Sequence, residues 1–439
     1  MQLSFNGPFH NDRKTAAGFL GRKNMKNITK LGAVSALSLI VGASASFADT
    51  IKVGFIDPLS GPFASTGTNG LHQFEFAADY MVNANGGLLD GTMMEVVGFD
   101  NKISPKESLI QLQVAIDQGI RYIVQGNSSG VANALTEAVD KHNRRNPDSR
   151  VLFLNYAAVD PALTNDKCNF WHFRFDAHAD MKMDAITDSI AEETDIKNVY
   201  VIGQDYSFGK AVSDAANKFL GEKRADVTIV GDELHPIGKV NDFTPYARKI
   251  VNANTDAVIT GNWGADMLGL GKSIIENGYT GPIYTYYAAG SGITAAFGES
   301  GKGTIRLVGE GQINPPPNDE AAAYVTAFKE KYSDGNVDQT RIANTIGMLA
   351  AAIEEAGTAD DVVAVANALS GMEYETIFGG KIFMRPQDHQ AVQDLHIFEH
   401  TDVDMPFPFD NSPYGVRVIK TIPMASADIE TTCQMKAPS

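Results

Sequence analysis

The sequence predicts an α/β protein made of two doubly wound lobes. Strand-like segments alternate with helix-like segments of about 10–15 residues, which is typical of parallel sheets with helices on both faces. The alternating units are too numerous for one compact sheet, and a chain of 439 residues suggests two or three domains at roughly 100–200 residues each. Hydrophobic residues make up 44% and charged residues 20% of the chain, as in ordinary globular proteins.

The first run of alternating elements begins at Ile51. Apolar residues from Leu71 to Val82 recur at helical spacing. The Gly-Gly pair after Asn85 ends that helix, because glycine tolerates the left-handed cap. The expected strands of this run are Ile51–Asp57, Met94–Phe99, Tyr122–Gln125 and Val151–Asn155. Its expected helices are Leu71–Asn85, Pro105–Gln118 and Val131–His142.

The alternation resumes after Arg174 and leads into a helical third quarter. The expected strands of this second run are Asn198–Ile202, Asp226–Asp232, Ala257–Thr260 and Pro282–Tyr286. Its expected helices are Asp184–Glu193, Gly209–Leu220, Phe243–Asn252 and Ala265–Asn277. The helices expected after them are Glu320–Tyr332, Thr340–Glu355 and Asp360–Leu369. Short strands are expected around Lys381–Met384, Leu395–Phe398 and Gly415–Ile422.

Residues 1–48 predict a secretory signal peptide rather than a part of the fold. Basic residues, the last of them Lys30, precede an apolar run from Leu31 to Val41, and small residues follow as far as Ala48. This order of charged, apolar and small residues is the mark of a cleaved export signal, and the run is shorter than the ~20 residues of a membrane helix. We expect cleavage after Ala48, a true start at Met25, and a mature protein exported to the periplasm.

Composition and motif spacing argue against several classes of function. Lys and Arg number 36 against 53 Asp and Glu, a net charge of -17, whereas nucleic-acid binding needs a basic surface. The segment Gly269–Ser273 resembles the end of a phosphate-binding loop, but Asp266 stands where the motif needs glycine. No Gly-x-Ser-x-Gly motif supports a hydrolase. His396 and His400 fall on an expected strand, about 13 Å apart, so they do not indicate a metal site.

A series of short motifs runs in order along nearly the whole chain that follows the signal peptide. They are Ile51–Gly54, Leu59–Ala64, Asn83–Gly87, Gly126–Gly130, Ala158–Thr164, Asp205–Gly209 and Asp242-Phe243, followed by the helix Ala350–Gly357. In this order they resemble the type I periplasmic solute-binding proteins, and in particular the leucine/isoleucine/valine-binding, hydrophobic amino acid uptake family of ABC transporters.

The resemblance implies two Rossmann-like lobes joined by a three-strand hinge, with the ligand trapped between the lobes. The chain is then expected to cross near Trp171–Phe175, near Val308–Ile313 and near Leu395–Phe398. Lobe one is expected to hold residues 51–172 plus 312–395, and lobe two residues 173–311 plus 396–439.

The segment Ser128-Ser129-Gly130 is the first candidate for the ligand site. It lies between a strand end and a helix start, where free N–H groups and the helix dipole favour an anion. The family uses this turn for the ligand carboxylate, although an N-cap serine is the alternative. A second candidate surrounds Val159, which replaces a threonine common in the family. The full candidate set is Thr66, Ser128, Ser129, Ala157, Ala158, Val159, Tyr206, Phe208, Trp263 and Tyr287.

The position of Tyr287 departs from the family pattern. The family commonly has an acidic residue there that pairs with the ligand ammonium, and a buried ammonium needs a counter-charge. Asp160, Asp205 and Asp266 remain as replacements, and buried packing remains the alternative role for the aromatic residues. We therefore expect a ligand without an α-ammonium group, or with one that is held differently.

The resemblance implies the extracytoplasmic substrate-binding component of an ABC importer, without catalysis and without a cofactor. The expected ligand is a small carboxylate, either a branched-chain or other hydrophobic amino acid or an aromatic acid. The expected partners are the membrane subunits of the transporter, and the protein is expected to be a monomer. A ligand-sensing receptor of the same fold and a secreted α/β enzyme are the alternatives.

The two cysteines, Cys168 and Cys433, are expected to form a disulfide. An exported protein meets an oxidising compartment, and a short polar C-terminal tail frays unless it is tied down. A bond to Cys168 ties that tail near the first crossover, provided that the Cα atoms lie within about 7 Å. Two free thiols are the alternative.

Overall fold

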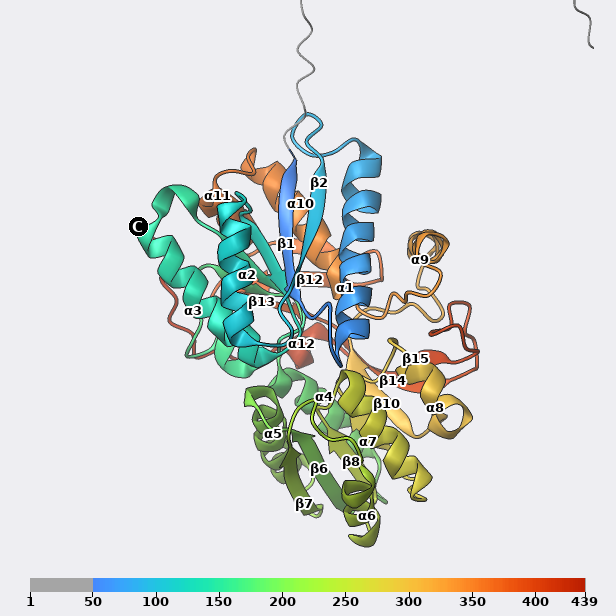
Figure 1. Cartoon of the computed structure of the whole chain (residues 1–439). Coiled ribbons are helices and arrows are strands. Elements are labelled where there is room, and N and C mark those ends of the chain that lie inside the picture. Colours follow the sequence, from blue (N-terminus) through green and yellow to red (C-terminus); the bar gives the residue numbers. More distant parts are fainter. Residues whose placement is uncertain (1–49, 439) are drawn as a thin grey trace, which may run out of the picture. The chain divides into compact units, whose positions relative to one another are not determined.

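The computed structural model describes residues 50–438, and their strands form two sheets (Figure 1). In spatial order, the first sheet consists of β11 (Glu373–Glu375), β12 (Lys381–Arg385), β13 (Gln390–Gln393), β5 (His172–Arg174), β4 (Leu152–Asn155), β3 (Tyr122–Gln125), β1 (Ile51–Asp57) and β2 (Met94–Asp100). From β2 to β13 neighbouring strands are parallel, and β12 and β11 continue the edge antiparallel. Parallel strands are covered on both faces, which explains why β1 is buried at every residue except Lys52.

The second sheet repeats this plan with a different edge. In spatial order, it consists of β15 (Gly415–Ile422), β14 (Leu395–Thr401), β10 (Ile305–Gly309), β9 (Ile283–Thr285), β8 (Ala257–Thr260), β6 (Asn198–Gln204) and β7 (Thr228–His235). The strands from β7 to β10 are parallel, and β14 and β15 are antiparallel. Together the two sheets give the expected α/β class with two doubly wound lobes.

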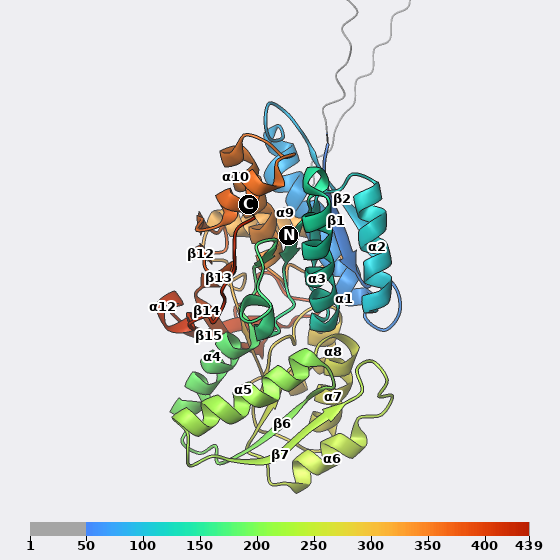
Figure 2. The same ribbon diagram turned by 90° about the vertical axis from the view of Figure 1, so that its left-hand side faces the viewer.

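Helices cover both faces of each sheet (Figure 2). Those packed with the first sheet are α1 (Ala64–Ala77), α2 (Pro105–Asp117), α3 (Ser129–Arg145), α9 (Asp319–Lys331), α10 (Arg341–Ala356) and α11 (Val362–Leu369). Those packed with the second are α4 (Ala179–Glu192), α5 (Ser207–Lys223), α6 (Thr244–Asn252), α7 (Gly264–Glu276), α8 (Ile293–Gly301) and the short α12 (Met424–Ala427). Within the described range, no helix has both the length and the apolar character that a bilayer span requires.

The first helix begins seven residues earlier than its apolar pattern predicts. Helix α1 starts at Ala64 instead of Leu71, and its first turns contain Thr66 and Gly67. The carbonyl oxygen of Pro58 lies 1.7 Å from where a Cβ of residue 67 would be, so only glycine fits against the β1–α1 loop. The helix continues through a π-helical segment, Ala78–Val82, and ends beyond Asn85 at Gly86, whose φ of 96° matches the expected left-handed cap.

Three strand-linked segments join the two sheets. The chain leaves the first sheet after β5, returns after β10, and passes from β13 to β14 through Asp394. The strands of the first sheet lie in residues 51–174 and 373–393, and those of the second in residues 198–309 and 395–422. The expected signal peptide, residues 1–48, lies outside the described residues.

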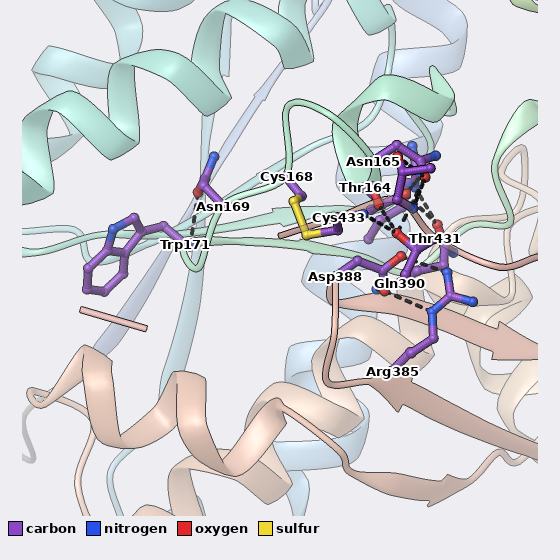
Figure 3. Close-up of a disulfide and its surroundings, with 12 residues drawn as sticks. Thr164, Asn165, Cys168, Asn169, Trp171, Arg385, Asp388, Gln390, Thr431 and Cys433 are labelled. Carbon is purple, nitrogen blue, oxygen red and sulfur yellow. Dashed lines mark hydrogen bonds and ion pairs between the residues drawn. A yellow bond between two sulfur atoms is a disulfide. The ribbon is translucent and has the colours of Figure 1, made fainter. Parts of the chain in front are cut away.

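The C-terminal tail belongs to residues 396–439, which the expected division assigns to lobe two, and it contacts lobe one as well. After α12 the tail lies against the first lobe (Figure 3). Arg385, which also pairs with Asp388, binds the Asp428 carboxylate and donates to the carbonyl oxygen of Ile429 at 2.7 Å. Arg385 of lobe one thus holds a segment that follows the last strand of lobe two.

A disulfide completes this attachment. Cys168 and Cys433 are bonded, with their Cα atoms 5.9 Å apart, within the spacing that a disulfide allows. Beside it the hydroxyl of Thr431 donates to the carbonyl oxygen of Thr164 at 2.8 Å, and the N–H of Thr432 donates to Asn165 Oδ1 at 2.9 Å. The tail therefore forms a fourth link between the lobes.

Candidate functional site

The carboxyl ends of parallel strands from both sheets line one cavity of about 100 Å³. Ligands bind at this edge of open α/β sheets, because helix N-termini and loops gather there. The first sheet contributes the ends of β3 and β4, and the second the ends of β6, β8, β9 and β10. Nine of the ten candidate residues lie on its wall: Thr66, Ser128, Ser129, Ala157, Val159, Tyr206, Phe208, Trp263 and Tyr287.

Ala158 is the candidate that the structure does not place on the cavity wall. Its N–H donates to Asn155 Oδ1 at 2.7 Å, and its carbonyl oxygen accepts from Asn155 Nδ2 at 2.8 Å. Both backbone groups are thus used to close the turn after β4, and the alanine is buried.

The turn before α3 offers hydrogen-bond donors to the cavity. Ser128 has a φ of 79°, which turns the chain sharply into the helix that begins at Ser129. In the described part of the chain, the backbone N–H groups of Ser129 and Gly130 have no acceptor, as is usual for a first helical turn. Ser129 Oγ accepts from the N–H of Asp160 at 3.2 Å and keeps its own proton available. These donors and the helix dipole suit an anion.

A buried carboxylate fixes the backbone of this turn. Asp57, at the end of β1, accepts from the N–H groups of Gly126 and Asn127 at 3.0 Å each, and from the hydroxyl of Tyr156 at 2.6 Å. Burial raises the pKa of Asp57 to about 7, although these donors oppose the rise. The strand end of β1 thus positions the anion-binding turn of its neighbour β3.

Aromatic side chains of the second lobe form the opposite wall. Trp263 donates from Nε1 to the hydroxyl of Tyr206 at 2.9 Å, and the ring of Phe208 lies 6.1 Å from that of Tyr287. Phe63, from the β1–α1 loop, packs on Trp263 with ring centroids 4.3 Å apart. This contact joins the lobes at the cavity, and the wall suits an apolar or aromatic ligand body.

Tyr287 contacts a cluster of four buried charges. Its hydroxyl donates to Asp176 Oδ2 at 2.8 Å. Lys182 Nζ lies 2.6 Å from Asp176 Oδ1 and 4.0 Å from Glu310 Oε2, and Arg341 donates to Glu310 Oε1 at 2.8 Å. The four side chains are 0–6% exposed. We call Asp176, Lys182, Glu310 and Arg341 the hinge cluster, because its two acids follow β5 and β10, where the chain crosses between sheets.

The hinge cluster is internally neutral, with two acids and two bases. Burial raises the pKa of Asp176, and burial and Asp176 together raise the pKa of Tyr287 well above its ordinary value. For Glu310, burial favours the neutral form, but Arg341 and Lys182 outweigh it and hold the pKa below its usual range. Asp176 and Glu310 likewise raise the pKa of Arg341 against the effect of burial. Mutual pairing is what allows these charges to be buried.

The acids on the cavity wall are not those considered from the sequence. Asp205 is exposed and lies 3.7 Å from Lys210. Asp266 accepts from Gln204 and Gly238, and Asp160 from Asn133 and Ala162, so both carboxylates serve local structure. None of the three lines the cavity, whereas Glu310 and Asp338 do.

Sequence reasoning missed Glu310, Asp338 and Arg341. Glu310 lies in a crossover between two glycines, Arg341 is the first residue of α10, and Asp338 lies in the segment just before that helix. A signal was available for Arg341, because polar residues in the first turn of a long apolar helix lie at the sheet edge where the strands end.

Comparisons with known proteins match this chain to binding proteins along nearly its whole length. A family model described as "Periplasmic binding protein" matches residues 50–403. A protein named "Leu/Ile/Val-binding protein homolog 4" from Brucella abortus is 29% identical, over 94% of this chain and 100% of its own length. A solved leucine-, isoleucine-, valine-, threonine- and alanine-binding protein from Brucella ovis, in a closed conformation, is 28% identical with a TM-score of 0.78, over 89% of this chain and 100% of that one.

A more distant structure has the same fold. It is an ABC-transporter solute-binding protein from R. palustris in complex with 4-hydroxybenzoate, with 19% identity and a TM-score of 0.73 over 85% of this chain and 97% of that one.

Proposed function

Because the chain belongs to the periplasmic binding protein family, we propose that it is the extracytoplasmic substrate-binding component of an ABC importer. The observation that carries this proposal is the free N–H at Ser129, beside that of Gly130 at the start of α3, on the wall of a cavity that both lobes line. They suit a ligand carboxylate, and the aromatic wall opposite suits an apolar ligand body. The proposal includes no catalysis and no cofactor.

Two classes of ligand fit this chemistry. A hydrophobic amino acid such as leucine is supported by the names of the relatives that match nearly the whole chain. An aromatic acid is the second candidate, favoured by Tyr206, Phe208, Trp263 and Tyr287 on the cavity wall.

Transport follows from closure of the lobes around the ligand. A ligand that contacts both walls binds the closed form more tightly and shifts the equilibrium towards it by that difference in affinity. The membrane subunits of the transporter then recognise the closed form. A sensing role uses the same closure with a different partner, so deletion of the gene and measurement of ligand uptake separate transport from sensing.

A ligand screen tests the proposal. The mature protein is mixed with leucine, isoleucine, valine, benzoate and 4-hydroxybenzoate, and its melting temperature and calorimetric affinity are measured. At least one ligand is expected to raise the melting temperature, because a ligand that binds only the folded state stabilises it. If none of them binds, or if the bound ligand is chemically converted, the proposal is wrong.

Ser129→Ala is expected to weaken ligand binding by roughly 1.5–3 kcal/mol, the range for a hydrogen bond to a charged group. The hydroxyl is lost while the backbone N–H groups and the helix remain. Titration calorimetry with the ligand found in the screen measures the change. Ser104→Ala is the matched control, because Ser104 caps α2 away from the cavity. Equal affinities of Ser129→Ala and the unchanged protein would remove this serine from the site.

A further inference from the structure

Asp338 is an acid on the cavity wall without a cationic partner. Its Oδ1 accepts from Asn69 Nδ2 and from Gln73 Nε2, each at 2.8 Å. Both donors belong to α1, and both are neutral. Within residues 50–438, no Lys, Arg or His lies within ion-pair distance of Asp338, and Oδ2 accepts no hydrogen bond from a side chain or from another residue's backbone. One oxygen is thus fixed by α1, and the other receives no hydrogen bond from a neighbouring residue, while the residue as a whole lines the cavity.

Glu310, the other acid on the cavity wall, already pairs with cations of the protein. One of its oxygens accepts from Arg341, and the second lies 4.0 Å from Lys182. The hinge cluster is neutral as it stands, so a cationic group placed against Glu310 would compete with two cations of the protein. Asp338, in contrast, has no Lys, Arg or His of the described residues within ion-pair distance.

The charges around Asp338 come from three elements packed near it. Burial raises the pKa of Asp338 to about 7, and the donor Gln73 opposes this rise. Asp410, from the β14–β15 loop, raises the pKa further, whereas Arg341 of α10 lowers it. Lys329 of α9 is half-buried nearby, and its own pKa is lowered by burial. The charged form of a carboxylate in these surroundings is stabilised by a cation that arrives with the ligand.

The second lobe closes over this carboxylate. A Cβ at Gly290, in the loop that follows β9, would lie 2.3 Å from Asp338 Oδ2, and the φ of Gly290 is +68°. Only glycine permits such an approach of the backbone. This approach of the second lobe leaves Asp338 only partly accessible to solvent, and a charge pair is stronger in such a site than in bulk water.

Asp338 and the anion-binding turn line the same cavity. The hydroxyl of Tyr156 accepts from Asn127 Nδ2 at 3.1 Å, next to Ser128. The same hydroxyl would lie 3.2 Å from a Cβ at Gly70, in the turn of α1 that carries Asn69 and Gln73. Tyr156 thus packs between the first turns of α1, whose Asn69 and Gln73 hold Asp338, and the segment that leads into the turn.

We propose that Asp338 binds the ammonium group of the ligand, and that the protein therefore selects an α-amino acid over a carboxylic acid of the same shape. This inference rests on the proposed function, with the ligand carboxylate at the Ser128–Ser129 turn. It assigns to the segment that precedes α10, in the first lobe, the role that the family pattern places near Tyr287 in the second.

The test compares leucine with 4-methylpentanoate, which has the same carbon skeleton and carboxylate but no amine. The unchanged protein is expected to bind leucine roughly 10- to 100-fold more tightly, as for a hydrogen bond to a charged group. Asp338→Asn is expected to abolish most of this preference, because the amide keeps the shape and the acceptor for Asn69 and Gln73 but loses the charge. Asp205→Asn is the matched control, since Asp205 is exposed and off the cavity wall.

A pH series gives a second readout. Protons and the ligand ammonium compete for Asp338, so the affinity for leucine is expected to fall as the pH is lowered from 8 to 6, through the pKa of about 7. Asp338→Asn is expected to remove this dependence, and 4-methylpentanoate is expected not to show it.

The outcomes separate this inference from the proposed function. Equal binding of the two ligands by the unchanged protein, an undiminished preference in Asp338→Asn, or binding of benzoate alone overturns the role of Asp338 and leaves a carboxylate-binding protein. Failure of every ligand to bind overturns both.

Discussion

Replacement of Lys182 by Met is expected to lower the free energy of unfolding by about 3–5 kcal/mol, the cost of leaving a buried charge without its partner. Lys182 Nζ lies 2.6 Å from Asp176 and 4.0 Å from Glu310, and all three side chains are at most 1% exposed. Without the ammonium, two buried carboxylates share the single cation of Arg341. Urea-induced unfolding followed by circular dichroism measures the difference.

Lys197→Met is the matched control for this experiment. Lys197 also forms an ion pair, with Asp226, but the two side chains are 54% and 51% exposed, and such pairs contribute at most about 1 kcal/mol. Adding Glu310→Gln to Lys182→Met is expected to restore part of the stability, because Asp176 and Arg341 are then left as a balanced pair. If Lys182→Met costs no more than Lys197→Met, the hinge cluster is not a buried ionic network.

Loss of the Cys168–Cys433 disulfide is expected to lower the free energy of unfolding by about 3–5 kcal/mol, near the upper end of measured values. The bond joins residues 265 positions apart, so it removes much conformational freedom from the unfolded chain. The double variant Cys168→Ser/Cys433→Ser is compared with the unchanged protein by urea unfolding, with and without a reductant.

The reductant provides an internal control, since it is expected to destabilise the unchanged protein and to leave the double variant unaffected. Thr431→Ala removes a single neighbouring hydrogen bond and is expected to cost only about 1 kcal/mol. Two titratable thiols in natively folded, exported protein would contradict the disulfide.

The fold could be predicted because its parallel strands and long helices carry strong local patterns. The strand Tyr122–Gln125 has the bounds that its apolar run predicts. Short or polar elements escaped prediction. Helix α8 is preceded by Gly290 and Gly292 and contains Gly298, and β13 has glutamine at both ends. Their structure depends on the neighbours they pack against, and a local pattern does not reveal those neighbours.

Residues of the candidate site could be predicted where one short segment of the sequence contains all the features that indicate a binding role. The turn at Ser128 combines a strand end, small residues and a helix start in a few positions. Asp338 has no such local signal, because its character comes from Asn69 and Gln73, more than 260 positions earlier, and from an approach of Gly290 that only the folded chain creates. Packing likewise explains why Ala158 lies off the wall, since both its backbone groups are bound by Asn155.

The packing of Phe63 on Trp263 gives the protein a built-in optical probe. The chain has two tryptophans. Trp263 touches the β1–α1 loop of the first lobe and donates to Tyr206, so separation of the lobes exposes its indole to water and shifts its emission. Trp171 is 4% exposed and packs against Phe170 and Arg150 within the first lobe, and its environment does not depend on closure. Fluorescence of the unlabelled protein therefore follows opening and closing against a constant internal background.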